Sequence, residues 1–434
     1  MDAVSVIARK RDGNALSRDE IHHFLSSYMR GEIPDYQMSA LLMAICIQGM
    51  ELDETIELTR AMIESGRLLD LSAIPGRKVD KHSTGGVGDK TSLVVVALAA
   101  SAGAVVPKLA GRALGHTGGT IDKLESIPGL TTELESERFL RQLCRVGAAI
   151  SAQTSDIAPA DKQIYALRDV TGTVGSIPLI TASVASKKVA AGAGGIVLDV
   201  KSGAGALVSD ASRARLLARW LVDVIRGFSR SAIALVTDME QPLGATVGNA
   251  LEVAEAVDVL RGEGPLDLRC LCLELAATML LLAGERDIEA CRGRVADLLD
   301  TGAALEKFAE IVHAQGGDPR VVTEPRAVLP SAKETSTVRS RSDGYVTGLD
   351  AAAIGRACML LGAGRRRVGE DIDPAAGVVL QLKIGDAVSR GDELATMHAS
   401  SLDRLALAEP LVYGAYRVAD RPPQKRRLIL DVID

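Results

Sequence analysis

Apolar residues recur at helical spacing in the amino-terminal part of the chain, as in Tyr36–Ile47 and Ile56–Ile63. Ser17 with Glu20 forms the capping-box pattern that begins a helix. Because both features are typical of amphipathic helices, we expect three helices between residues 17 and 67. Together they form a helical lobe.

From Lys78 the pattern changes to short β-branched runs that alternate with helical stretches. The predicted strands are Lys78–Asp80, Ala104–Pro107, Ala148–Ile150, Ile196–Val200 and Ala232–Thr237. Such alternation predicts a largely parallel sheet with helices on both faces. The apolar runs Leu93–Val106 and Cys270–Leu282 are short for membrane spans, and we expect buried helices, the first continuing into a strand.

The last part of the chain, beyond Pro330, alternates strands and turns and resembles the barrel-sandwich shape of biotinyl and lipoyl domains. The predicted fold class is therefore α/β: a helical lobe, a large mixed α/β domain with a mostly parallel sheet, and a C-terminal α+β domain. We expect the α/β domain to take residues 77–160 and about 193–325, and the C-terminal domain to take residues 331–434.

Composition narrows the function classes. A chain of 434 residues with 47% apolar content can bury a large core in two or three domains. The net charge of −6 argues against an extended nucleic-acid footprint. The amino terminus lacks the apolar core of a signal peptide, and the six cysteines show no paired metal spacing. We expect a cytoplasmic protein with neither a nucleic-acid nor a membrane partner.

The glycine-rich stretch Val79–Ser92 joins a short strand to a helix. Its glycines let backbone N–H groups approach an anion, the helix start contributes a positive dipole end, and Lys81 adds charge. A second glycine-rich turn, Gly115–Thr120, follows the next strand. Neither stretch fits a nucleotide-binding loop. The sequence therefore predicts a site for inorganic phosphate or a small phosphorylated group.

Several motifs, in order along the chain, resemble the thymidine and pyrimidine-nucleoside phosphorylase family. They are Lys81–Asp89, Gly111–Arg112 with Leu114–Gly129, Ala158–Lys162 and Ser176–Ser183. The match runs from Lys81 to about Glu255, and a fainter likeness covers nearly the whole chain. The resemblance implies reversible phosphorolysis of pyrimidine nucleosides, with inorganic phosphate as co-substrate and no organic cofactor. It also implies a homodimer. It further implies that residues of about 161–192 return to a helical lobe of residues 1–68, so that the active site is a cleft between this lobe and the α/β domain.

The resemblance assigns roles by position. It gives His82, Arg168 and Lys187 as catalytic residues acting on the leaving base. The implied phosphate ligands are Lys81, Ser83, Ser92, Lys108 and Thr120. The implied nucleoside contacts are Leu114, Arg168, Ile180, Ser183 and Lys187. A cation or donor at His82 would stabilise charge on the departing base.

Some relatives hold K⁺ mainly through backbone carbonyls. The matching positions are Gly88, Lys90, Leu243, Thr246 and the carboxylate of Glu255. Relatives often have threonine where this chain has Lys90. A Lys90 side chain that turns inward would replace the ion, whereas a Lys90 that offers only its carbonyl would leave the site in place.

Two departures bear on specificity. Ala110 stands where relatives usually carry serine, which removes one phosphate donor. Lys108 stands where thymidine-selective relatives tend to have methionine and the broader pyrimidine branch tends to have lysine. A lysine there would meet the ribose 2′-hydroxyl, which favours a broad pyrimidine-nucleoside phosphorylase; the alternative is a solvent-facing charge at the end of a strand.

Three other functions stay open. A strict thymidine phosphorylase would use the same motifs. A phosphoribosyltransferase would share the fold and glycine loops, but it should carry an acidic motif for Mg²⁺ and diphosphate, which we do not find in the sequence. A non-enzymatic nucleoside-binding protein would need only the base contacts, whereas this chain also carries Lys81, His82 and Ser83.

Overall fold

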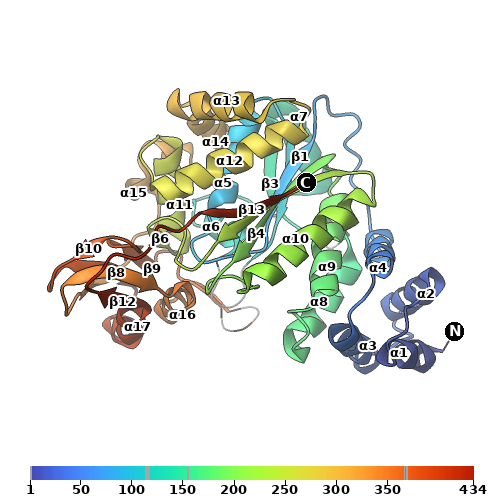
Figure 1. The fold of residues 1–434 in the computed structure, drawn as a ribbon. Helices are drawn as coiled ribbons and strands as arrows, with labels where there is room; N and C mark the ends of the chain where they lie inside the picture. The colour runs from blue at the N-terminus through green and yellow to red at the C-terminus, as the bar shows by residue number, and fades with distance from the viewer. Residues whose placement is uncertain (1, 113–117, 154–155, 366, 368–369) are drawn as a thin grey trace.

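The computed structural model describes residues 2–112, 118–153, 156–365, 367 and 370–434 (Figure 1). The chain begins with helices α1 (Ala3–Arg11), α2 (Arg18–Met29), α3 (Asp35–Gln48) and α4 (Leu52–Glu64). The three predicted helices are confirmed as α2, α3 and α4, and the sequence patterns missed α1. The predicted capping box is present, because Ser17 Oγ accepts from the Glu20 N–H and the Glu20 carboxylate accepts from the Ser17 N–H.

Two later helices, α8 (Pro159–Thr171) and α9 (Ile177–Ala190), pack against this amino-terminal bundle (Figure 1). Ile164 of α8 and Leu179 of α9 belong to the same buried cluster as Phe24 and Met38. The far side of α9 faces the sheet, since Val184 and Ala185 lie in a second cluster with strand residues. Helix α9 therefore contacts both bodies.

The central sheet contains the parallel strands β1 (Val79–Ser83), β4 (Gly195–Ser202) and β5 (Ser231–Asp238). Strands β2 (Val106–Ala110) and β3 (Ala148–Ala152) also pair in parallel. A bridge between Lys78 and Val105 connects β2 to the β1 side. All five predicted strands are confirmed. Because they are parallel, their carboxyl ends lie at one edge, where β1 delivers its polar residues.

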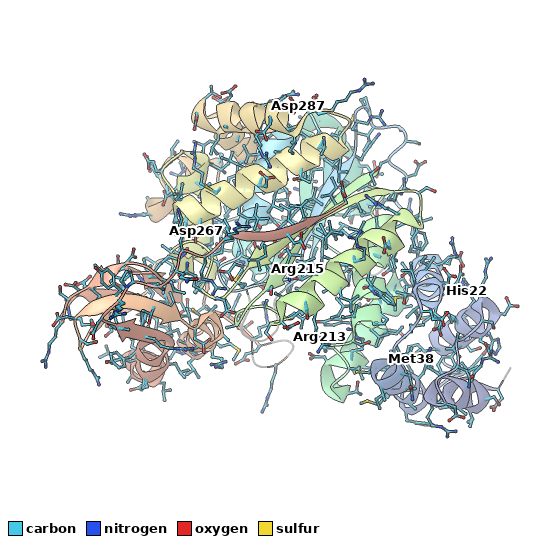
Figure 2. The ribbon with its side chains drawn as sticks, viewed as in Figure 1. His22, Met38, Arg213, Arg215, Asp267 and Asp287 are labelled. Carbon is cyan, nitrogen blue, oxygen red and sulfur yellow. The ribbon has the colours of Figure 1, made fainter. Side chains whose placement is uncertain are left out.

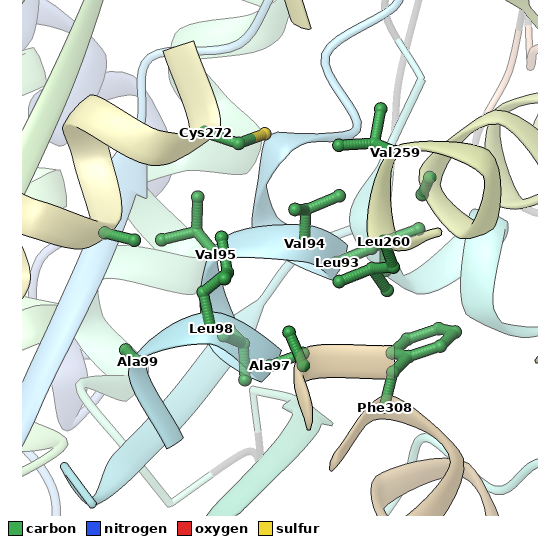
Figure 3. Packing of buried hydrophobic residues seen from close by; sticks show 14 of the residues in the cluster. Leu93, Val94, Val95, Ala97, Leu98, Ala99, Val259, Leu260, Cys272 and Phe308 are labelled. Carbon is green, nitrogen blue, oxygen red and sulfur yellow. The ribbon is translucent and has the colours of Figure 1, made fainter. Parts of the chain in front are cut away.

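Helices cover both faces of the sheet (Figure 1). Those that contact its strands include α5 (Thr91–Ser101), α7 (Ser136–Val146), α10 (Ala211–Arg226) and α12 (Leu266–Leu282). Further helices pack against these or beside them: α6 (Thr120–Leu124), α11 (Asn249–Leu260), α13 (Ile288–Asp300), α14 (Ala303–Ala314) and the short α15 (Pro325–Val328). Figure 3 shows Leu93 and Leu98 of α5 packed among Leu260, Cys272 and Phe308. Helix α5 is buried on every side, which explains its unbroken apolar sequence. Both predicted buried helices are confirmed. The run at 93–106 forms α5 and leads into β2, and the run at 270–282 lies in α12.

The described residues of the C-terminal part form antiparallel sheets and helices, which confirms the α+β prediction (Figure 1). Its elements are β7 (Glu334–Arg339), β8 (Gly344–Leu349), α16 (Ala351–Leu361), β9 (Gly377–Leu380), β10 (Ala387–Val388), β11 (Glu393–Ala399), α17 (Leu402–Ala415) and β12 (Tyr416–Ala419). One sheet has the order β10-β8-β12. The other takes in β6 (Thr246–Val247), in the order β6-β9-β11-β7. Strand β6 therefore ties this part to the α/β core.

The last strand, β13 (Ile429–Ile433), does not stay with the C-terminal sheets. It pairs antiparallel with β5 and becomes the edge of the central sheet, so residues 331–434 do not form one separate unit. Apolar contacts accompany this pairing: Ile429 packs against one core cluster, whereas Leu430 and Ile433 pack against another. In the part of the chain that the structure describes, no helix has the length and apolar character needed to cross a membrane.

Candidate active site

Lys81 lies at the carboxyl half of β1 and is fully buried. Its ammonium group donates to Thr91 Oγ1 at 2.6 Å and lies 3.2 Å from Asp199 Oδ2. Lys201, on β4, approaches the same carboxylate at 2.7 Å. Two buried lysines thus share Asp199, and Lys81 also lies 3.9 Å from the carboxylate of Asp89, so the lysine charges in this group are balanced by two carboxylates.

A second group of charges centres on Asp80, one residue before Lys81. Lys188 Nζ donates to Asp80 Oδ2 at 2.6 Å and to the Leu109 carbonyl at 2.9 Å. Lys108 Nζ lies 3.6 Å from Asp80 Oδ1 and also donates to the Lys81 carbonyl. Lys108 is 3% exposed, so its alternative role as a solvent-facing charge is wrong. Burial lowers the pKa of Lys108 to about 7, against the opposing attraction of Asp80.

The first glycine loop is closed by Asp89. Its carboxylate accepts from the hydroxyls of Ser83 and Thr91, and the Gly85 N–H donates to Ser83 Oγ at 3.1 Å. The pKa of Asp89 stays well below its usual range despite burial, because Lys81 and Lys201 and these hydroxyl donors favour the carboxylate. Ser92 follows in the first turn of α5. The loop therefore has its own internal bonds, and a ligand would compete with Asp89 for the hydroxyl of Ser83.

Lys123 joins the two glycine-rich turns. Its ammonium group donates to the Asp89 carbonyl at 2.8 Å and to the Gly118 carbonyl at 3.2 Å, and it lies 3.0 Å from Glu252 Oε2. Thr120 begins α6 beside this junction. The described part of the second turn therefore lies next to the first. The remainder, including Leu114, lies outside the described residues.

The residues expected to hold the base come together between α8 and α9. Lys187 Nζ donates to Asp161 Oδ2 at 2.6 Å and to Ser183 Oγ at 3.0 Å. The Arg168 guanidinium and the Lys187 ammonium both lie over the Tyr165 ring, at 5.7 and 6.0 Å from its centre. Arg168 is almost fully buried and donates to the carbonyls of Leu179 and Val174.

Ile180 is buried one residue after Leu179 and belongs to the core cluster that lies on the sheet. Among the described residues, the Arg168 Nε is a buried donor without a partner. This N–H is therefore left without a hydrogen bond at the junction of α8 and α9.

His82 stands between these two bodies. Its pKa is lowered well below the usual value, first by burial and then by the positive charges of Lys188, Lys108, Lys187 and Lys81. These lysines come from β1, β2 and α9, so the two bodies meet at this imidazole. This direction favours the neutral imidazole, which carries one N–H donor.

The oxygens expected to hold K⁺ are brought together, but the Lys90 side chain turns into them. Lys90 Nζ lies 2.8 Å from the Thr246 carbonyl, 3.1 Å from the Leu243 carbonyl and in contact with the Glu255 carboxylate. Gly88 lies against the same oxygens, because a Cβ on Gly88 would be 2.6 Å from the Leu243 carbonyl oxygen. A potassium ion at these oxygens does not fit with Lys90 in this position.

The sequence patterns gave no role to several residues that organise the site. Asp80 lies inside the stretch Val79–Ser92 and Lys188 directly follows Lys187, but neither position indicates an ion pair, because Asp80, Lys188 and Asp199 find partners on other elements. Asp161 lies inside one of the recognised motifs, Ala158–Lys162, and that was the one signal for it. Asp161 reaches Lys187 because α8 packs against α9, and no spacing along the chain reveals that contact.

Comparisons with known proteins agree with this geometry. Residues 4–66 match the glycosyl transferase family, helical bundle domain, and residues 75–305 match the glycosyl transferase family, a/b domain. Residues 345–419 match the pyrimidine nucleoside phosphorylase C-terminal domain. The three matches cover the helical lobe, the α/β core and the C-terminal sheets in chain order.

Individual relatives are similar over the full chain. A pyrimidine-nucleoside phosphorylase of Geobacillus stearothermophilus is 48% identical over 434 residues, covering 100% of both chains. One of Staphylococcus aureus (strain bovine RF122 / ET3-1) is 48% identical over 93% of both. A crystal structure of anthranilate phosphoribosyltransferase from Thermus thermophilus has a TM-score of 0.58 at 20% identity, over 73% of this chain and 99% of that one. This last likeness concerns the fold alone.

Proposed function

Since the chain belongs to the pyrimidine-nucleoside phosphorylase family, we propose that it catalyses the reversible phosphorolysis of uridine, deoxyuridine and thymidine. The observation that carries the proposal is the group of lysines near His82, whose pKa is lowered first by burial and then by the charges of Lys188, Lys108, Lys187 and Lys81. Such a site suits two anions in turn, the phosphate that enters and the pyrimidine base that leaves.

Phosphate attack forms the bond from C1′ to a phosphate oxygen and breaks the bond from C1′ to N1 of the base. The electron pair of the broken bond stays on the base, which leaves as an anion or takes a proton. We propose that Lys81 and the hydroxyls of Ser83, Ser92 and Thr120 place the phosphate. Lys108 donates to the Lys81 carbonyl, and its protonated form would add positive charge beside the phosphate.

We propose that the base lies against Lys187, Arg168 and Ser183. Both cations bind a pyrimidine anion more strongly than the neutral base, so they stabilise the transition state more than the substrate. The unpartnered Arg168 Nε supports this assignment. His82, as a neutral donor, would add one hydrogen bond to the base carbonyl that gains charge.

The two sets of ligands lie on different bodies. We propose a helical lobe of residues 1–68 and about 161–192, an α/β domain of residues 77–160 and about 193–325, and a C-terminal domain that ends before β13. The buried cluster shared by α2, α3, α8 and α9 supports this division. Catalysis would then require the lobe to close on the α/β domain.

We also propose a two-fold homodimer that forms through the amino-terminal helices. Leu41, Leu42 and Ile45 are buried in the lobe itself, so they belong to its core. Tyr36 and Ile47 are instead exposed on α3, at 75% and 73%, and they supply the apolar surface that an interface needs. Light scattering at working concentration tests this, and a stable monomer would contradict it. A cytoplasmic location stays a prediction that rests on cysteine usage.

Product analysis tests the function. Uridine, deoxyuridine and thymidine are each incubated with enzyme, with and without inorganic phosphate. The expected result is free base and sugar 1-phosphate only when phosphate is present. Free sugar formed equally fast without phosphate would indicate a hydrolase, and turnover only with phosphoribosyl diphosphate would indicate a phosphoribosyltransferase. Turnover of thymidine and deoxyuridine without uridine would indicate a strict thymidine phosphorylase, and nucleoside binding without turnover would indicate a binding protein.

A further inference from the structure

The ammonium group of Lys90 is buried among oxygen atoms at the amino-terminal end of α5. It donates to the Thr246 carbonyl at 2.8 Å and to the Leu243 carbonyl at 3.1 Å, and it forms an ion pair with Glu255. Lys90 is 1% exposed and Glu255 is 4% exposed. An ammonium group has three N–H donors, and these acceptors, with the Thr246 hydroxyl at 3.2 Å, satisfy all of them.

Charge is balanced as well. The Glu255 carboxylate carries a single negative charge, and Lys90 neutralises it directly. The other Glu255 oxygen accepts from the Ala245 N–H at 2.8 Å. A second cation at the same carbonyls would stand next to the ammonium group in a buried, poorly screened place, where like charges repel strongly.

Packing leaves the ammonium group closely surrounded. A Cβ on Gly244 would lie 2.3 Å from Glu255 Oε2 and 3.0 Å from Lys90 Nζ. Gly244 has φ +72°, so its backbone turns tightly around this point. The oxygens and the ammonium group thus form one packed unit.

This unit connects three parts of the molecule. Lys90 follows the first glycine loop, Glu255 lies on α11, and Thr246 begins β6, which pairs with β9 of the C-terminal sheet. In the segment that carries Leu243 and Thr246, the Gly244 carbonyl accepts from Lys383 at 2.8 Å, and Lys383 forms an ion pair with Asp267. Figure 2 shows Asp267 near the start of α12, where the core faces the C-terminal domain.

We propose that the Lys90 ammonium group is a built-in cation that takes the place of a free monovalent ion at the oxygens of Leu243, Thr246 and Glu255. The protein then needs no K⁺ to hold the first glycine loop against the C-terminal domain. Because the lysine is covalently attached, the loop keeps its anchor at any salt composition. The proposal concerns structure and does not depend on which nucleoside is cleaved.

The first experiment uses the wild-type protein. It is exchanged into potassium-free buffer, and its melting temperature and its kcat/KM are measured in choline chloride and in KCl at equal ionic strength. Both quantities should be the same in the two salts. A saturable rise of the melting temperature with KCl would show that a free ion still binds, and it would overturn the proposal.

The second experiment uses Lys90→Thr, which removes the ammonium group and leaves a hydroxyl, with Lys90→Met as the matched control. In choline chloride both variants should melt lower than the wild type, because Glu255 loses its cation. KCl should raise the melting temperature of Lys90→Thr saturably; at 100 times the dissociation constant, the folding equilibrium shifts about 100-fold. Lys90→Met should not respond, because its side chain fills the space.

Two results would contradict the proposal: a Lys90→Thr protein as stable as the wild type in choline chloride, or the same KCl response in Lys90→Thr and Lys90→Met. Should Lys90→Thr fail to fold in either salt, the wild-type comparison decides alone. In that case, equal melting temperatures in both salts support the built-in cation.

Discussion

The ammonium group of Lys188 donates a 2.6 Å hydrogen bond to the carboxylate of Asp80, and both side chains are buried. This pair joins α9, which packs on the helical lobe, to β1 of the central sheet. Lys188 directly follows Lys187, and Asp80 lies two residues before His82. One ion pair therefore sets the distance between the helix that carries a base ligand and the strand that carries the histidine.

We expect Lys188→Met to destabilise the protein by about 3–5 kcal/mol, the usual cost of leaving a buried charge with a broken pair. Lys108 would be the nearest remaining cation to Asp80, at 3.6 Å. The shift is measured by urea unfolding followed by circular dichroism. Lys162→Met, an exposed change on α8, is the control and should stay within about 0.5 kcal/mol of the wild type. If both substitutions change the free energy of unfolding equally, the Lys188–Asp80 pair does not stabilise the fold.

Asp161 is expected to act by positioning Lys187, whose ammonium group it holds at 2.6 Å. Asp161→Asn keeps a carbonyl acceptor, so it should reduce kcat/KM by about tenfold, whereas Asp161→Ala should approach the larger loss of Lys187→Met. A 5-fluorinated uridine releases a more acidic base, which needs less help from a cation. Lys187→Met and Asp161→Ala should therefore lose less activity on that nucleoside than on uridine, and equal losses on both would assign them a role in folding alone.

His82 should contribute a single hydrogen bond from a neutral imidazole, because burial and then the surrounding lysines lower its pKa. His82→Gln keeps an N–H donor and His82→Phe does not. We expect kcat/KM of the phenylalanine variant to fall below that of the glutamine variant by about 10- to 100-fold, the value of a bond worth about 1.5–3 kcal/mol. If the glutamine variant is as inactive as the phenylalanine variant, a neutral N–H donor is not sufficient. The reaction would then need the charged imidazolium form of His82.

Lys108 should make stability depend on pH. Burial lowers its pKa in the folded protein from 10.5 to about 7, so between these values the unfolded chain binds more protons than the folded one. Stability therefore rises with pH in this window, by up to about 1.4 kcal/mol per unit, and the cost of the buried charge is fully present below pH 7. Urea unfolding of the wild type and of Lys108→Met at pH 6.5, 8 and 9 measures the difference between their free energies of unfolding. As the pH rises, this difference should shift in favour of the wild type. A constant difference would mean that Lys108 keeps its proton throughout.

Lys108→Met also tests nucleoside choice. A contact with the ribose 2′-hydroxyl requires the ammonium group to leave the Lys81 carbonyl or to donate a further N–H bond. If that contact forms, the variant should lose about 10- to 100-fold more kcat/KM with uridine than with thymidine. Equal losses would assign Lys108 to phosphate, and no loss for either nucleoside would leave it as a structural charge.

Local patterns predicted much of the scaffold. The capping box at Ser17, the five parallel strands and the buried helical runs at 93–106, which continues into a strand, and 270–282 follow from periodicity, capping and composition, which act over a few residues. The glycine loop and its neighbour could also be read from the chain, and Lys123 now ties the two at Asp89 and Gly118. The last strand, β13, could not be placed, because its partner β5 lies far earlier in the chain.

The sequence by itself determined which chemical groups are present: the lysines and hydroxyls after β1, the histidine, and the cations on α8 and α9. It left the direction of Lys90 open, since a lysine side chain is long enough to point outward or inward. The tertiary structure decided this by bringing Leu243, Thr246 and Glu255 to its ammonium group. It likewise lowered the pKa values of Lys108 and His82 through burial. Burial and charge pairing depend on elements distant in sequence, so only the folded chain fixes them.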